Sequence, residues 1–141
     1  MLRRSIQLNP KHHQALNSLA YLWANENRNL AEAEKLLTRA LELSPNNPGY
    51  QDTLAWIYHQ KGRYQEAHAL LLLALEKLPL NPEILEHLGQ VQLRLGRQED
   101  ALKSWTLALP NSSRPKELQA LIDDVSKGRL ATLQTESKSE N

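Results

Sequence analysis

The chain contains two similar nine-residue segments, and the spacing between them constrains its fold more than any other feature. Residues 40–48 read ALELSPNNP, and thirty-four residues later residues 74–82 read ALEKLPLNP, with six of nine positions identical. A structural unit that cannot bury its apolar face alone needs a copy beside it. Repetition at a fixed step therefore indicates a repeat architecture.

Other residues also recur at a spacing of 34 positions: Pro45 and Pro79, Pro48 and Pro82, Gly62 and Gly96, and the alanines at 33, 67 and 101. Between these positions, apolar residues recur at every third and fourth position, which is typical of amphipathic helices. Proline and glycine at these positions fit helix starts and ends. We expect first helices near 11–26, 47–61 and 82–95, and second helices near 30–43, 64–77 and 98–109.

The motifs L-x2-L-A-x2-W…A-x3-L…A…P from Leu16, L-A-x2-Y…A-x3-L…A…P from Leu54 and L-x2-L-G-x2-Q…A-x3-W…A from Leu85 resemble tetratricopeptide (TPR) repeats. The resemblance covers about residues 11 to 110. It implies an all-α fold: a right-handed TPR superhelix of antiparallel helix pairs. It also implies small residues where the helices of a pair approach, at Ala20, Ala55 and Gly89. The implied core residues are Trp23, Leu37, Tyr58, Leu71 and Trp105.

The expected organisation has six parts. They are the second half of a truncated preceding repeat (1–10), TPR 1 (11–46), TPR 2 (47–80), TPR 3 (81–113), a capping helix (114–127) and a flexible tail (128–141). The first repeat is one residue longer than the second, within NENRN at 25–29. MLRRSIQLNP aligns with the end of a second helix, so we expect this to be the C-terminal part of a longer bacterial protein. A polar-backed helix at the end keeps a solenoid soluble.

Composition excludes several classes of function. The formal net charge is +1, so no basic footprint favours nucleic acid. The apolar run at 70–75 is far shorter than a membrane span, and the residues MLRRSIQLNP lack the apolar core that a signal peptide carries. A chain without cysteine suits reducing and oxidising compartments alike. The compartment stays open: cytoplasmic, or periplasmic if the chain is part of an envelope lipoprotein, as in some proteins it resembles.

The five histidines do not predict a metal site. His12 and His13 are adjacent, the others lie on different predicted helices, and no pair has the i,i+4 spacing that places two imidazoles on one helix face. Neither a Gly-rich phosphate loop nor a Ser/His/Asp signature is present, although a triad assembled only in space is not testable from sequence. We expect no cofactor and no catalytic residue.

The resemblance implies that the first helix of each repeat lines a concave groove that holds ligand peptides. The groove residues expected from it are Asn17, Tyr21, Asn25, Asp52, Trp56, His59, Glu86, His87, Gln90 and Arg94. Trp56 is the expected anchor, because tryptophan is enriched at interface hot spots. The alternative is that Trp56 packs against Tyr21 and neighbouring helices, or under a segment that is missing here or belongs to a partner. The groove charges are mixed, and a clamp for a chaperone carboxylate is rejected because Tyr21, Thr53, Glu83 and His87 depart from its pattern.

These observations favour a non-catalytic interaction module, a scaffold or adaptor that binds a peptide or partner protein in the groove. The alternative is a homo-oligomer assembled through the N-terminal half repeat, whose Leu2, Ile6 and Leu8 form an apolar edge.

Overall fold

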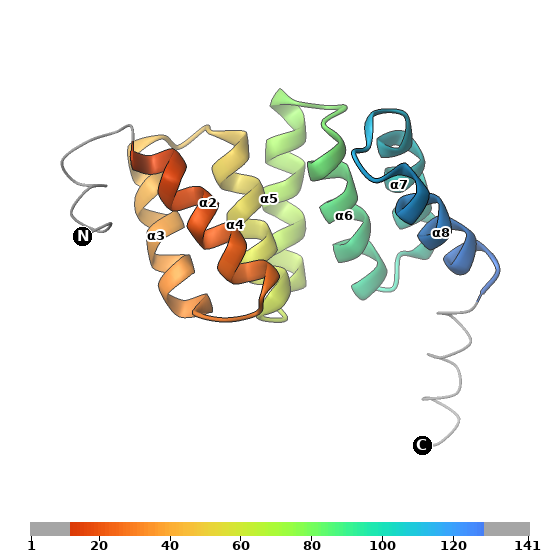
Figure 1. Ribbon diagram of the computed structural model, residues 1–141, viewed down its shortest axis with the longest axis horizontal. Helices are drawn as coiled ribbons and strands as arrows, with labels where there is room; N and C mark the ends of the chain where they lie inside the picture. The colour runs from red at the N-terminus through yellow and green to blue at the C-terminus, as the bar shows by residue number, and fades with distance from the viewer. Residues whose placement is uncertain (1–11, 129–141) are drawn as a thin grey trace, which may run out of the picture. The chain divides into compact units, whose positions relative to one another are not determined.

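The computed structural model describes residues 12–128 (Figure 1). The half repeat expected at 1–10, the self-association assigned to it, and nearly all of the tail expected at 128–141 lie outside the described residues. Within 12–128 the chain forms seven α-helices and one short 3-10 helix, with no strand. The all-α prediction is confirmed.

The helices form three consecutive pairs followed by a single helix. Their bounds are α2 (His12–Asn25) with α3 (Leu30–Leu43), α4 (Pro48–Gln60) with α5 (Tyr64–Lys77), α6 (Pro82–Arg94) with α7 (Gln98–Ala108), then η1 (Leu109–Asn111) and α8 (Pro115–Ser126). Each bound lies within one residue of the sequence prediction. The prolines and glycines in the sequence predicted the helix ends closely, because their effects on backbone conformation are local.

The repeated Asn-Pro ends of the two nine-residue segments are helix starts. Asn47 precedes α4, and its side-chain Oδ1 accepts a hydrogen bond from the backbone N–H of Tyr50 at 3.0 Å. Asn81 caps α6 in the same way, accepting from the N–H of Ile84 at 3.1 Å. The proline that follows each asparagine occupies the first turn, where its missing N–H costs nothing.

Residues in the turns between paired helices adopt the left-handed backbone conformation, in which φ is positive. Gly62 and Gly96 have φ of 81° and 80°, which glycine adopts without steric cost. In the longer first repeat, Asn27 and Asn29 take that conformation instead, with φ of 54° and 52°. Asparagine tolerates this region better than other side chains, so the extra residue in NENRN is accommodated without glycine.

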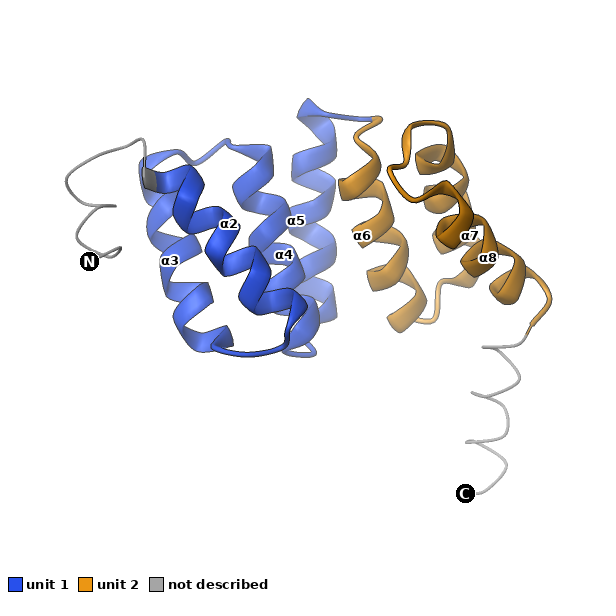
Figure 2. Ribbon diagram, in the orientation of Figure 1, with its two compact units in different colours: residues 1–79 blue, residues 80–141 orange. Residues whose placement is uncertain are grey.

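Two compact units make up the chain, residues 1–79 and 80–141, and each is described by itself (Figure 2). In the first unit, α4 packs against α2, α3 and α5. Its core includes Ala20, Ala55, Leu37 and Leu71, all at most 1% exposed. Trp23 and Tyr58, expected in the core, are half-buried and pack against its edge.

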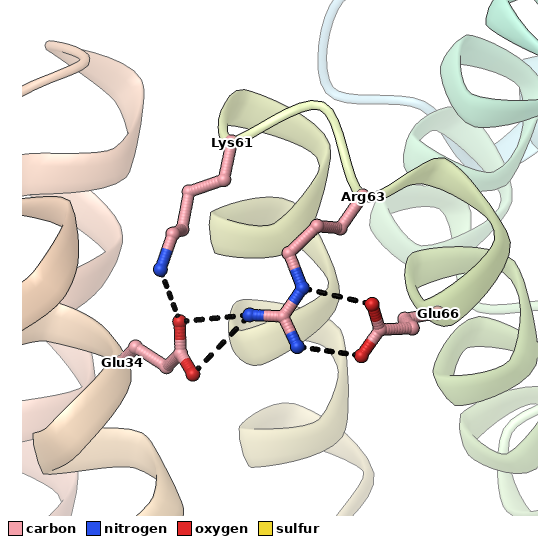
Figure 3. A network of polar contacts seen from close by, with 4 residues as sticks. All are labelled: Glu34, Lys61, Arg63 and Glu66. Atoms are coloured by element: carbon pink, nitrogen blue, oxygen red, sulfur yellow. Dashed lines mark hydrogen bonds and ion pairs between the residues drawn. The ribbon is translucent and has the colours of Figure 1, made fainter.

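A polar network joins the two helix pairs of the first unit (Figure 3). Glu34 of α3 accepts from Lys61 Nζ at 2.6 Å and from Arg63 at 3.2 Å. Arg63 also binds Glu66 of α5, and this hydrogen bond and charge lower the pKa of Glu66. The Arg63 guanidinium lies 4.2 Å from the ring centroid of Tyr58. Burial, then the Glu34 carboxylate, raise the pKa of that phenol.

The second unit depends on a close approach between α6 and α7. Trp105 is fully buried, and its indole N–H donates to the backbone oxygen of Glu86 at 3.1 Å. A methyl group on Gly89 would overlap this indole ring. Gln92, which occupies the repeat position that Trp23 and Tyr58 hold in the other two repeats, accepts from the Ser104 hydroxyl at 2.7 Å, so that buried polar group is satisfied. The single helix α8 packs on α7.

We predict that Gly89→Ala lowers the free energy of unfolding by about 3 kcal/mol, because the added methyl group forces Trp105 from its site. Urea unfolding followed by circular dichroism measures this. Gly89→Ala combined with Trp105→Leu reproduces the alanine and leucine pairing of Ala55 and Leu71. The double variant should therefore unfold close to Trp105→Leu alone, whereas simple additivity would show that the two sites are independent.

We predict that Glu34→Gln lowers the free energy of unfolding by about 1 kcal/mol, since it removes the carboxylate shared by Lys61 and Arg63. The loss should shrink at high salt, where charges are screened. The matched control is Glu42→Gln on the same helix, whose exposed pair with Arg39 should matter less. Equal effects of the two variants would contradict a special role for the network.

Candidate functional site

The predicted site residues of the first unit lie on its two first helices. Together they form the α2–α4 face, which comprises Asn17, Tyr21, Asn25, Asp52, Trp56 and His59. Helices α2 and α4 pack against each other. The structure brings Asn25 and Trp56 into direct contact although they are 31 residues apart.

A hydrogen bond from the indole N–H, on the edge of the ring, holds the Trp56 side chain in place. Its indole N–H donates to Asn25 Oδ1 at 2.8 Å. One turn further along α4, the Gln60 amide donates to the backbone oxygen of Ala24 at 2.6 Å. These two bonds tie α4 to the last turn of α2. The ring is half-buried and packs against the core cluster, so it contributes to the core while remaining partly on the surface.

One face of the Trp56 ring is covered by His59. The two ring planes are 6° from parallel, with centroids 4.4 Å apart. On α5, Tyr64 meets the imidazole edge-on at 5.4 Å. His59 itself is buried, at 8% exposure. It therefore supports Trp56 from within and presents little surface to a ligand.

Charge is scarce on the two helices of this face. Helix α2 has no Asp, Glu, Lys or Arg, and α4 has Asp52 alone. The Asp52 side chain is buried, at 6% exposure. Tyr21 and Asn17 are half-buried and Asn25 is exposed. The accessible chemistry of the α2–α4 face is therefore aromatic and amide.

The predicted site residues of the second unit, on α6, have a different environment. The Glu86 carboxylate accepts from Ser112 Oγ at 3.3 Å and from Arg114 at 3.2 Å, and its side chain is 13% exposed. His87 is buried, Gln90 is half-buried and Arg94 is exposed. The segment that leads into α8 thus engages Glu86, one of the residues expected to meet a ligand.

Sequence reasoning named Asn25 and His59 as site residues but missed their contacts with Trp56, and it missed Ser112 and Arg114, which contact Glu86. The Asn25–Trp56 bond joins different repeats, and no local pattern signals it. The contact of Ser112 and Arg114 with Glu86 spans 26 and 28 residues. The one property of the α2–α4 face that the sequence shows without a structure is the absence of Asp, Glu, Lys and Arg from α2.

Residues 12–128 include no cluster of three or more His, Cys, Asp or Glu that could hold a metal ion. None of the helices in this part of the chain has the length and apolar character needed to cross a membrane.

Comparison with known proteins gives consistent matches. Residues 24–83 match the family model described as Tetratricopeptide repeat. A TPR repeat-containing protein of Pseudomonas aeruginosa is 36% identical over 62 residues, which are 44% of this chain and 10% of that protein. The chain thus spans about a tenth of the length of this relative.

Two solved structures are similar in fold. A thermophilic TPR protein of Thermus thermophilus has a TM-score of 0.72 at 21% identity, over 88% of this chain and 69% of that one. The protein MamA (MSR-1) has a TM-score of 0.59 at 23% identity, over 84% of this chain and 64% of its own. Both support a helical repeat solenoid.

We predict that Trp56→Phe lowers the free energy of unfolding by about 1 kcal/mol, since it loses the hydrogen bond to Asn25 and keeps an aromatic ring. Trp56→Ala should cost about 2 kcal/mol, less than a fully buried tryptophan. Both variants should still unfold cooperatively in urea. A Trp56→Ala chain that does not fold would support the alternative that this residue is purely core.

Proposed function

Since the chain carries tetratricopeptide repeats, which generally mediate interactions between proteins, we propose that it is a non-catalytic scaffold or adaptor module. It binds a peptide or a partner protein on the first helices of its repeats, with the α2–α4 face as the principal contact. The similarity to a Pseudomonas aeruginosa protein supports a bacterial source.

The observation that carries this proposal is the state of Trp56. It is a large aromatic side chain, half-buried, with its orientation fixed by Asn25 and by the stacked His59. A side chain already ordered in the free protein loses little conformational entropy on binding. Tryptophan in such a position is a typical interface hot spot. Trp105, by contrast, is fully buried, whereas Trp23 is half-buried and packs against the core cluster as Trp56 does.

The residues of α6 contribute less in this proposal. Glu86 is engaged by Ser112 and Arg114, and His87 is buried. Gln90 is half-buried and Arg94 is exposed.

The test is affinity capture with matched variants. The purified chain, Trp56→Ala and Leu73→Ala are immobilised, and lysate of the source organism is passed over each. Leu73 is an exposed apolar residue of α5, outside the α2–α4 face, at 46% exposure. Retained proteins are identified by mass spectrometry.

We expect a partner that the parent and Leu73→Ala retain and that Trp56→Ala loses. Urea unfolding of all three chains checks that they are folded under the capture conditions. Identical retention by all three chains would place binding on another surface and overturn the assignment of the α2–α4 face.

A further inference from the structure

A stripe of small and apolar residues on α2 is largely open to solvent. The stripe, or α2 edge, consists of Ala15, Ser18, Leu19 and Leu22. Its members are three or four positions apart, so they share one side of the helix. Leu22 is 47% exposed, Ala15 and Ser18 are exposed, and Leu19 is half-buried. None of the four belongs to the α2–α4 face, so the edge is separate from the proposed binding surface.

The same positions are buried in the other two first helices. Counted from the small residue in the middle of each first helix, Leu22 corresponds to Ile57 in α4 and Val91 in α6. Both of these are 0% exposed. Tyr50 of α4 fills the position of Ala15, and it is 5% exposed. The exposure of the α2 edge is therefore not a general property of first helices in this chain.

In α4, a second helix covers this side. Helix α3 packs against α4, and its Leu36, Leu37 and Ala40 belong to the same buried cluster as Ile57. Within residues 12–128, no helix precedes α2 and covers its edge in this way. Removing a leucine side chain from water is favourable. The occupant that fits the α2 edge is therefore a helix with the apolar pattern found in the second half of α3.

The residues directly before α2 have that pattern. MLRRSIQLNP at 1–10 and LLTRALELSP at 36–45 are identical at four of ten positions, and both end in a proline shortly before a first helix. Leu2 and Ile6 stand at positions where α3 has leucine. Residues 1–8 also equal in length the part of α3 that they align with. The chain itself thus supplies a segment of suitable length and chemistry.

An ion pair shows which residues of α3 and α4 lie at the same level. Glu34 of α3 meets Lys61, directly after α4, at 2.6 Å. The two helices run in opposite directions (Figure 1). Leu37 is three residues after Glu34, and Ile57 is four residues before Lys61, so the rise of 1.5 Å per residue places them at about the same level.

We propose that residues 1–8 dock on the α2 edge as a short helix antiparallel to α2, as α3 covers α4. One repeat back from Leu37 and Ile57, the corresponding residues are Leu2 and Leu22, which meet in the docked state. A helix of two turns is not stable alone in water, so its order comes from this contact. The inference is independent of the proposed function, because it uses a different side of α2.

Cysteine pairs test the docking in the full chain, which has no cysteine of its own. The test pair is Leu2→Cys with Leu22→Cys, and the control pair is Leu2→Cys with Ala15→Cys. Leu22 and Ala15 are both exposed, so both chains should fold. The two positions are about 10 Å apart along the helix, whereas a disulfide joins Cα atoms about 4.4–6.8 Å apart. Products of mild oxidation are separated by non-reducing electrophoresis and weighed by mass spectrometry.

We expect an intramolecular disulfide that forms about tenfold faster in the test pair than in the control pair, since docking raises the effective concentration of one thiol at the other. Equal rates in the two pairs would mean that the segment meets both positions at random, and would overturn the docking. A disulfide-linked dimer in place of the intramolecular product would mean that a second copy covers the edge, which also overturns it.

Hydrogen exchange of the α2 amides is a second test that needs no new bond. Leu2→Ser combined with Ile6→Ser removes the apolar contacts of the segment. Arg4→Ser is the control, because Arg39, the aligned residue of α3, is exposed. We expect the amides around Leu22 to exchange about threefold faster or more in the double variant and at the parent rate in the control. Parent rates in both variants would contradict the docking.

Discussion

Each first helix carries a small, buried residue near its middle, and at Gly89 this residue allows the close approach of α6 and α7. Ala20 and Ala55 are fully buried, and Gly89 leaves no room for a methyl group beside Trp105. This approach fixes which side of the first helix faces its partner. Successive residues of an α-helix are about 100° apart, so Trp56, next to Ala55, is turned away from α5 and toward α2. The position of the candidate site is thus a consequence of the packing that makes the fold.

Polar interactions in the first unit are divided between two regions. Ion pairs lie at the turn and on the second helices, where Glu34, Lys61, Arg63 and Glu66 join α3 to the α4–α5 turn. On the α2–α4 face, hydrogen bonds between uncharged groups join the two helices, from Trp56 to Asn25 and from Gln60 to Ala24. The first helices are therefore tied together without charges, which leaves their surface chemically neutral.

The sequence predicted the helices closely, and it placed the candidate site residues on the first helices without showing which of them are accessible. Helix ends depend on Asn-Pro caps and left-handed turns such as Asn47-Pro48 and Gly62, whose effects are local. The burial of Asp52 and His59 depends on how neighbouring helices pack, and the repeat motif alone does not contain that information. The bond from Trp56 to Asn25 depends further on two side-chain rotamers. The repeat motif predicted where the candidate site residues lie on each helix, and only the packed structure shows which of them are buried.

Equivalent positions of the repeats carry different chemistry. The position of Trp56 holds Tyr21 in the first repeat and Gln90 in the third, and that of Asp52 holds Glu86 in the third. Helix α6 also carries Glu83 and Arg94 in its first and last turns, whereas α2 has no charge. Repeats that share a backbone arrangement can therefore differ in what they bind, since the packing constraint fixes the inward side of each first helix and leaves its outward side free to vary. In this chain the first unit has the partly exposed aromatic side chain whose orientation is fixed, Trp56. In the second unit the carboxylate of Glu86, at the position of Asp52, instead binds the segment before α8.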